Sequence, residues 1–169
     1  MELTFDMNYD LKAMTAMAKA VRKGLQEEQD KKSKIIGWTF VAAIVLILLL
    51  SDKFGWMQIT ALILTAGFAA YLIWQDKVNG YLAMKRLPEN LRSGKWLFRE
   101  DGYFSDTEAG ESDYSYESIF MMVESQGYMI LVFHDGKAHI IDMSTIQGGN
   151  DGDFRRLLRK KTSLTIQTL

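Results

Sequence analysis

The chain of 169 residues contains two histidines whose spacing suggests a metal site. His134 and His139 flank an Asp135-Gly136 pair, which is typical of a two-residue β-hairpin turn. That turn pairs residue 134 with 137 and residue 132 with 139, so both imidazoles lie diagonally on one face of the hairpin. Asp142, the nearest acid, then points to the opposite face, and a metal site needs at least a third ligand. Because the chain also has no cysteine, we predict no metal and no cofactor.

Two further segments have the residue types of an ion site but lack the spacing. An acidic cluster lacks the ligand spacing and the glycine of a calcium-binding EF-hand loop, and consists of Asp106, Glu108, Glu111 and Asp113. A glycine-rich segment at 148–152 has no Lys-Ser/Thr pair, and its acids would repel phosphate. We therefore predict a solvated hairpin tip and a connector. No nucleophile with a base beside it can be identified, so we do not expect an enzyme.

The densest positive patch lies near the C-terminus, on a predicted helix. It consists of Arg155, Arg156, Arg159, Lys160 and Lys161. Cations of this kind can dock on anionic lipid, each contributing about 1 kcal/mol near the surface. They also favour a helix C-terminus and solvate its exposed face, which is the second interpretation. Residues 96–169 nevertheless carry seven basic against twelve acidic side chains, and the formal net charge of the chain is −1. This balance excludes a generally basic nucleic-acid-binding protein.

Two apolar segments dominate the middle of the sequence. Residues 35–50 and 56–74 contain no charged side chain and are separated by five residues. As helices they would span roughly 24 and 28 Å, close to the hydrocarbon thickness of a bilayer. A chain of this size cannot bury two helices that are apolar on all sides. We therefore predict a transmembrane hairpin at 35–74, with the lipid bilayer as a partner.

The charges that flank this hairpin predict its orientation. Lysines and arginines precede the first segment and follow the second, whereas the loop between them offers only Lys53, beside Asp52. The positive-inside rule then places both termini in the cytoplasm of a multi-pass protein of the cell membrane. The second segment carries Ala61, Thr65 and Ala69 at a spacing of four, which allows close helix packing. The row is expected to pack against the first segment, with formation of a homo-oligomer as the alternative.

The remaining sequence predicts an α+β domain. Residues 1–34 have a short strand pattern and then an amphipathic helix that runs from about Tyr9 directly into the first span. Residues 75–95 are expected to connect the second span to a domain at 96–169. There, six segments alternate as short strands: 96–99, 103–106, 112–116, 119–124, 128–133 and 138–143. Asp151 or Asp153 can cap a closing helix, so we predict an antiparallel β meander closed by a C-terminal helix.

The segment at 128–133 is apolar on both faces, which a sheet with one wet face would not be. In the register of a two-residue turn, one face carries Tyr128, Ile130, Val132, His139 and Ile141. If the closing helix covers the other face, this face needs a cover of its own. The candidates are the N-terminal helix, a second copy of the chain or an unknown protein partner.

Several of these segments resemble the YcxB-like proteins, a family of small bacterial membrane proteins. The marks are the LTFDMNYDLKAM start, the two adjacent spans, Glu100-Asp101-Gly102, Tyr116-Glu117-Ser118-Ile119, the strand at 128–133, and His139-Ile140-Ile141. The resemblance implies a C-terminal domain similar to pleckstrin-homology folds, on the cytoplasmic side of a two-span anchor, and no catalytic activity. Family members often carry a Pro-Lys-Arg-like stretch after the last strand. Asp142-Met143-Ser144-Thr145 stands there instead, so an anion-binding role of that stretch does not carry over.

The function expected from these features is interaction at the inner leaflet. The protein would be a membrane-anchored module that binds a protein, a peptide or a lipid headgroup. The alternative is an immunity or resistance protein that neutralises a toxin acting on the bilayer.

Overall fold

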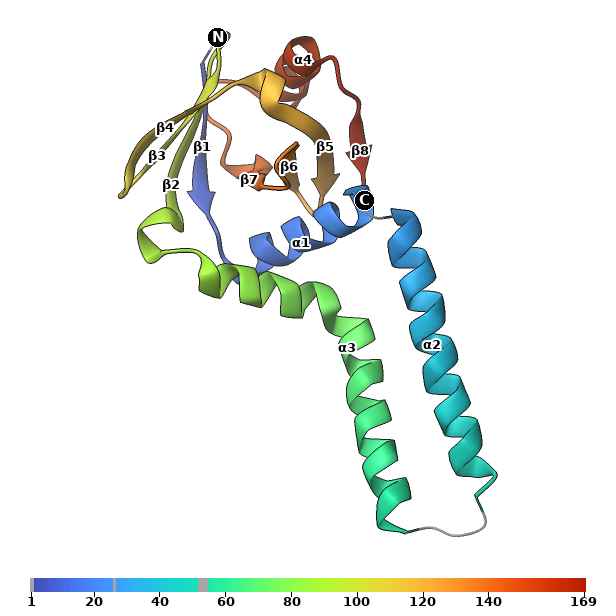
Figure 1. Cartoon of the computed structure of the whole chain (residues 1–169). Helices are drawn as coiled ribbons and strands as arrows, with labels where there is room; N and C mark the ends of the chain where they lie inside the picture. Colours follow the sequence, from blue (N-terminus) through green and yellow to red (C-terminus); the bar gives the residue numbers. More distant parts are fainter. Residues whose placement is uncertain (1, 26, 52–54) are drawn as a thin grey trace.

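A computed structural model of the protein describes residues 2–25, 27–51 and 55–169. Two long helices project side by side from one end of a domain rich in β-structure (Figure 1). The helices are α1 (Leu11–Leu25), α2 (Glu27–Leu49), α3 (Trp56–Arg86) and α4 (Asp151–Thr162). The strands are β1 (Leu3–Asn8), β2 (Ser93–Phe98), β3 (Tyr103–Thr107), β4 (Gly110–Tyr114), β5 (Ile119–Ser125), β6 (Tyr128–Phe133), β7 (Ala138–Asp142) and β8 (Ile166–Thr168).

The strands form two sheets rather than one meander. The first has the order β1-β2-β3-β4 and the second β7-β6-β5-β8, with β8 parallel to β5 and the other neighbours antiparallel. Strand β1 belongs to the first sheet because Leu3 pairs with Phe98 and Asn8 with Ser93. The predicted boundary at residue 96 therefore does not separate the N-terminal segment from the β domain. The helical hairpin instead lies between two neighbouring strands, β1 and β2.

Helix α4 closes one side of the core between the sheets. Asn150 caps it, because its side chain accepts a hydrogen bond from the backbone N–H of Asp153 at 3.0 Å. The predicted capping residue Asp153 takes the complementary role three positions on, where its carboxylate accepts from the Asn150 N–H at 3.4 Å. Phe154 is fully buried, with its ring 4.5 Å from Phe5 and 4.8 Å from Phe98. The helix thus seals the core against the first sheet.

The turn between β6 and β7 is one residue longer than predicted. The Phe133 N–H donates to the Lys137 carbonyl at 2.9 Å, and Gly136 adopts a positive φ of 80°. The loop therefore contains three residues, a geometry in which glycine supplies the left-handed position. Val132 pairs with Ala138 as a consequence, where the two-residue turn would have paired it with His139.

This shift of one residue moves part of the predicted surface to the other face. Tyr128, Ile130 and Val132 share one face of the second sheet, whereas His139 and Ile141 lie on the opposite face. The prediction that these five residues form one surface is wrong. Helix α1 packs across the face that carries Tyr128, with the Lys12 ammonium 5.4 Å from the tyrosine ring centroid. The N-terminal helix is therefore the cover of this face.

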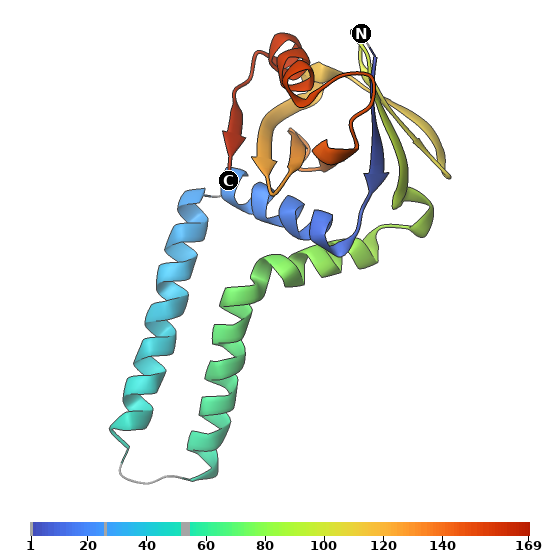
Figure 2. The ribbon, with the colours of Figure 1, turned by 180° about the vertical axis from the view of Figure 1, so that it is seen from behind.

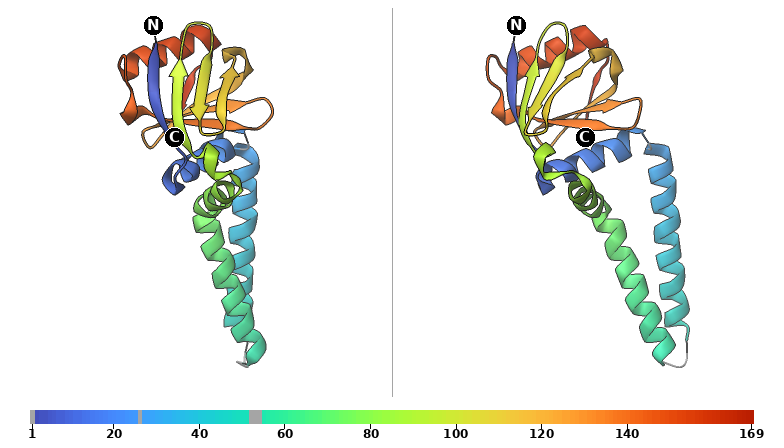
Figure 3. Two further views of the ribbon diagram at one scale, coloured as in Figure 1. Left: turned by 90° about the vertical axis from the view of Figure 1, so that its left-hand side faces the viewer. Right: turned by 60° about the vertical axis from the view of Figure 1, so that its left-hand side comes forward.

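Helices α1 and α2 are separate elements rather than one continuous helix. Helix α1 ends at Leu25, α2 begins at Glu27, and the two run in different directions (Figure 2). Helix α1 lies beside the C-terminal part of α3, between the β domain and the projecting hairpin (Figure 3). Within the predicted connector at 75–95, α3 continues to Arg86 and is capped at Leu87, directly before Pro88.

The projecting parts of α2 and α3 are long and apolar enough to cross a membrane. The mean hydropathy of their most apolar stretches is 1.9 and 1.6. They pack together where Gly37 faces Leu72, and a Cβ atom on Gly37 would lie 3.0 Å from a Leu72 methyl group. Of the row at a spacing of four on the second segment, Thr65 is buried, while Ala61 and Ala69 are half-buried. Asp52 and Lys53 of the predicted tip lie outside the described residues.

Candidate functional site

The most developed concave feature is a groove of about 800 Å³ on the side of the domain that faces the helices. Its walls come from α1, from the C-terminal part of α3, from the first sheet and from the turn before β7. Most of the lining is apolar, and it includes Met14, Met17, Val21, Ala83, Leu87, Trp96 and Tyr114. Methionine side chains adapt to varied apolar shapes, and aromatic rings supply large contact areas. The groove can therefore accept an apolar group of small-molecule size.

The second sheet also contributes to the groove, through Ala138 and His139 of β7. The Trp96 indole donates a hydrogen bond to the Ile140 carbonyl at 3.1 Å, which links the two sheets. The polar lining is sparse and comes from separate elements: Arg22, Asn79, Ser105, Thr107, Lys137 and His139. A few polar groups on a mostly apolar wall are typical of sites that orient an amphipathic ligand.

His139 lies at the edge of this groove in a cluster of aromatic rings. Its ring centroid is 4.6 Å from that of Trp96, 4.4 Å from Tyr114 and 4.6 Å from Phe133. Its Nδ1 atom is 3.2 Å from the Tyr103 hydroxyl. Burial lowers the pKa of His139 to about 4, so the imidazole is neutral near pH 7.

His134 does not meet His139 as the predicted register required. It lies on the exposed loop before Gly136, where its ring is 5.0 Å from that of Phe120. Within the residues that the structure describes, no group of three or more acidic or histidine side chains is arranged to hold a metal ion. The predicted acidic cluster lies around the exposed tip of the β3–β4 hairpin.

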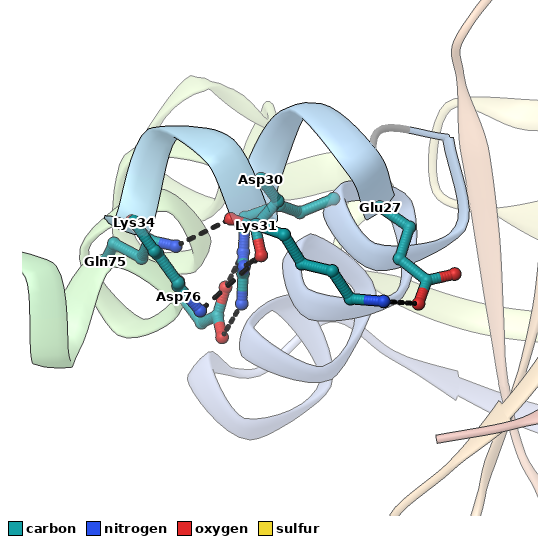
Figure 4. A network of polar contacts seen from close by, with 7 residues as sticks. Glu27, Asp30, Lys31, Lys34, Gln75 and Asp76 are labelled. Carbon is teal, nitrogen blue, oxygen red and sulfur yellow. Dashed lines mark hydrogen bonds and ion pairs between the residues drawn. The ribbon is translucent and has the colours of Figure 1, made fainter. Parts of the chain in front are cut away.

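A second polar site lies where α1, α2 and α3 meet, and we call it the charged junction. Its members are Arg22 of α1, Asp30 of α2 and Asp76 of α3 (Figure 4). The guanidinium donates two hydrogen bonds of 2.8 Å to the two oxygens of Asp76 and also contacts the Asp30 carboxylate. The side chains of Arg22 and Asp30 are each only 13% exposed. One arginine thus joins the carboxylates of both long helices.

Further side chains extend the charged junction toward solvent. Lys34 lies 3.5 Å from Asp30, and the Gln75 amide lies beside the same pair (Figure 4). Glu27 and Lys31 form an exposed pair at 2.6 Å on the adjoining turn. The hydrogen bonds that Arg22 donates to Asp76, above all, raise the pKa of Arg22, so this guanidinium stays charged.

Sequence reasoning did not identify the charged junction. Arg22 counted only among the cations before the first apolar segment, and neither Asp30 nor Asp76 was assigned a role. The available signal was a carboxylate close to one end of each apolar segment, with Asp30 five residues before the first and Asp76 two residues after the second. The groove was not predicted either, because its walls come from segments far apart in the sequence.

The basic patch on α4 is partly neutralised by partners. Arg155 makes two hydrogen bonds to Glu124, of 2.7 and 3.0 Å, and this guanidinium lowers the pKa of the Glu124 carboxyl. Arg156 lies 3.5 Å from Asp153. Helix α4 lies at the end of the domain opposite the projecting hairpin (Figure 1, Figure 3). The helix that carries the five cations predicted to contact lipid is therefore separated from the apolar helices by the β domain.

Comparison with solved structures gives only a distant likeness. A chain in the structure described as "Structure of the Spt16D Pob3N heterodimer" is 15% identical, with a TM-score of 0.32. The match covers 45% of this chain and 45% of that chain. A search of curated proteins found no match.

Comparison with protein families gives a clear result for the β domain. Residues 98–158 match the family model described as "YcxB-like protein". The matched segment runs from the last residue of β2 to the buried Leu158 of α4, and it contains the second-sheet hairpin and His139. Over this segment the chain is similar to the YcxB-like family, the family that its sequence motifs predicted.

Proposed function

We propose that the protein is a membrane-anchored module that binds a single-chain amphiphile, such as a fatty acid, in the groove beside the inner leaflet. The observation that carries this proposal is the position of the groove. Its wall includes Asn79, Ala83 and Leu87 of α3, the same helix whose earlier part is apolar enough to cross a membrane. Asn79 follows Trp74, the end of the apolar segment, by five residues, which is about 8 Å along a helix. A lipid-like ligand would have a short path from the bilayer.

The surface of the long helices supports the anchor. Ile47, Ile63 and Trp56 are 67%, 65% and 84% exposed, so large apolar side chains stand outward along both helices. Exposed apolar area of this extent is unfavourable in water and favourable in lipid. Basic residues flank the ends nearest the domain, and under the positive-inside rule this supports a cytoplasmic location for both termini.

The proposal also includes an assignment of the fold of the β domain. We infer that strands β1–β4 and β5–β7, followed by a C-terminal helix, form the pleckstrin-homology-like arrangement that the family resemblance implies. On this view the hairpin and α1 are an insertion between the first two strands. Such an insertion would hold the groove at a constant height above the membrane surface.

The chemistry of the lining favours an amphiphile. A volume of about 800 Å³ lies within the usual range for small ligands, and the methionine and aromatic walls suit an alkyl chain. Hydroxyl groups of Ser105 and Thr107 and the ammonium of Lys137 offer partners for a polar head. A protein partner would need a wider exposed apolar surface than this groove provides.

Photo-crosslinking tests the proposal with the full-length protein in lipid nanodiscs. A palmitate analogue with a diazirine in its chain is added, and the modified residues are mapped by mass spectrometry. Adducts at Met17 and Leu87 are expected, in addition to background adducts on the lipid-facing side chains of α2 and α3. Ala18→Trp fills the groove and should remove the groove adducts, whereas Ala109→Trp, at the exposed β3–β4 tip, should retain them. Adducts confined to the apolar helices would refute the proposal.

The orientation has its own test. Cysteine introduced at Ser51 should react with a membrane-impermeant maleimide in intact cells, and cysteine at Ser112 should not, because the chain has no native cysteine to interfere. Reaction at position 112 alone would reverse the proposed topology.

A further inference from the structure

We propose that Arg22 couples occupancy of the groove to the spacing of α2 and α3, so that ligand binding and the packing of the membrane helices influence each other. This inference rests on the proposed function. It follows from the fact that one side chain takes part in two sites. Arg22 lines the groove, and its guanidinium is also the centre of the charged junction.

The contacts of the charged junction make it a link among three helices. The two hydrogen bonds to Asp76 connect α1 with α3, and the ion pair with Asp30 connects α1 with α2. Carboxylates held this closely around one guanidinium lose favourable energy if either helix moves away. A displacement of Arg22 therefore acts on the position of both long helices.

The surrounding packing determines which helix can respond. Gly80 of α3 lies directly on α1, and a Cβ atom there would be 2.7 Å from the backbone nitrogen of Thr15. Helix α1 and the adjoining part of α3 thus form one tightly packed unit. Helix α2 meets this unit through Asp30 and meets the rest of α3 at Gly37. The structure therefore points to α2 as the element that moves relative to the other two.

The coupling has a definite physical origin. An alkyl chain in the groove lies against the methylene groups of Arg22 and restricts the rotamers open to this side chain. The rotamer of Arg22 sets where its guanidinium meets Asp30, and so sets the approach of α2. Because coupling between two sites is reciprocal, a change in the spacing of α2 and α3 must change the affinity of the groove by the same factor.

The experiment measures a distance between the two helices with and without ligand. Spin labels are attached to cysteines at Gln29 and Lys77, two exposed positions on α2 and α3, in the full-length chain in nanodiscs. Pulsed electron resonance gives the distance between the labels with and without saturating palmitate. Palmitate should shift the mean distance by about 2 Å, the scale of helix shifts in coupled proteins.

Two variants separate coupling from binding. Asp30→Asn removes the carboxylate of α2 and should abolish the shift, while the diazirine adducts in the groove persist. Arg22→Lys keeps the charge but cannot bridge both carboxylates, and should also abolish the shift. Lys32→Gln, an exposed change on the same helix, should leave the shift intact.

The possible outcomes distinguish this inference from the proposed function. If palmitate labels the groove but the distance does not change, or changes equally in Asp30→Asn, the coupling is refuted and the binding function stands. If palmitate fails to label the groove of the unmodified protein, the proposed function is refuted and the coupling falls with it.

Discussion

Acidification should destabilise the protein through His139. Burial lowers the pKa of this imidazole from 6.5 to about 4 in the folded chain. A group with a depressed folded pKa binds its proton more readily when the chain is unfolded, so the folded state loses stability as the pH falls from 6.5 toward 4. At about 1.4 kcal/mol per pKa unit, protonation costs about 2 kcal/mol at pH 5 and about 3 kcal/mol below pH 4.

The surroundings of His139 explain why its pKa is lowered and why its protonation destabilises the folded chain. The imidazole lies among Trp96, Tyr114 and Phe133, whose rings offer no negative charge to the protonated form. The Tyr103 hydroxyl is its hydrogen-bond partner. Asp135 raises the pKa and Lys137 lowers it, but both effects are smaller than that of burial.

The assay compares variants across pH. The free energy of unfolding of the full-length chain in detergent is measured with urea from pH 7.5 to pH 5. His139→Gln removes the titrating group and can retain a hydrogen bond to Tyr103. The variant should therefore lose about 2 kcal/mol less than the unmodified chain over this range. His134→Gln, on the exposed loop, should behave as the unmodified chain does.

Direct titration of the two histidines can refute this reasoning. The chain has two histidines, so their imidazole resonances can be assigned by comparing the two variants in nuclear magnetic resonance spectra. A pKa of His139 within half a unit of 6.5, or equal pH dependence in the unmodified chain and His139→Gln, would show that burial does not control this group.

Three further predictions concern packing and charge, each measured by denaturation of the full-length chain. Gly80→Ala places a Cβ atom 2.7 Å from the backbone of α1 and should lower the free energy of unfolding by about 1–3 kcal/mol. Its control, Gly67→Ala, meets no atom within 4 Å and should be neutral or stabilising by up to about 1 kcal/mol. Equal effects of the two substitutions would contradict the close approach of α3 to α1. Glu124→Gln leaves Arg155 without its carboxylate and should cost about 1 kcal/mol at pH 7. Because the pKa of Glu124 is lowered, this difference should disappear in acid as the carboxylate is protonated, and a constant difference would argue against the ion pair. Phe154→Ala should cost about 3–5 kcal/mol, and a loss below 1 kcal/mol would mean that α4 does not seal the core.

The sequence alone was sufficient for features that depend on local composition. The two apolar segments were recognisable because sixteen or more consecutive uncharged residues have few alternatives to a long helix in lipid or in a large core. The closing helix was predictable from the periodicity of Phe154, Leu157 and Leu158, which the structure buries. The family motifs were also local, and the match over 98–158 confirmed the assignment drawn from them.

The strand register was only partly contained in the sequence. The segments at 128–133 and 138–142 are strands as predicted, but Asp135-Gly136 fits a turn of two residues and a loop of three equally well. The difference reverses the faces on which His139 and Ile141 lie. Packing against the first sheet decided the register, because His139 packs with Trp96 and Tyr114 of that sheet.

The pairing of distant segments was decided by tertiary structure. The strand at residues 3–8 is too short for its sequence to indicate the strand with which it pairs. The pairing of Leu3 with Phe98 closes a loop that contains the entire helical hairpin. Strand β8, only three residues long, exists because β5 offers it an edge. A short strand has no stability of its own, so its existence depends on the neighbour with which it pairs.

The candidate site depends most strongly on tertiary structure. In the sequence, Arg22, Asp30 and Asp76 are ordinary polar residues near the ends of apolar segments, and each is compatible with exposure to water. The path of the chain brings three helices together at one point and excludes most of the solvent there. A buried charge is stable only with a partner, so the convergence of the helices turns three separate charges into one junction.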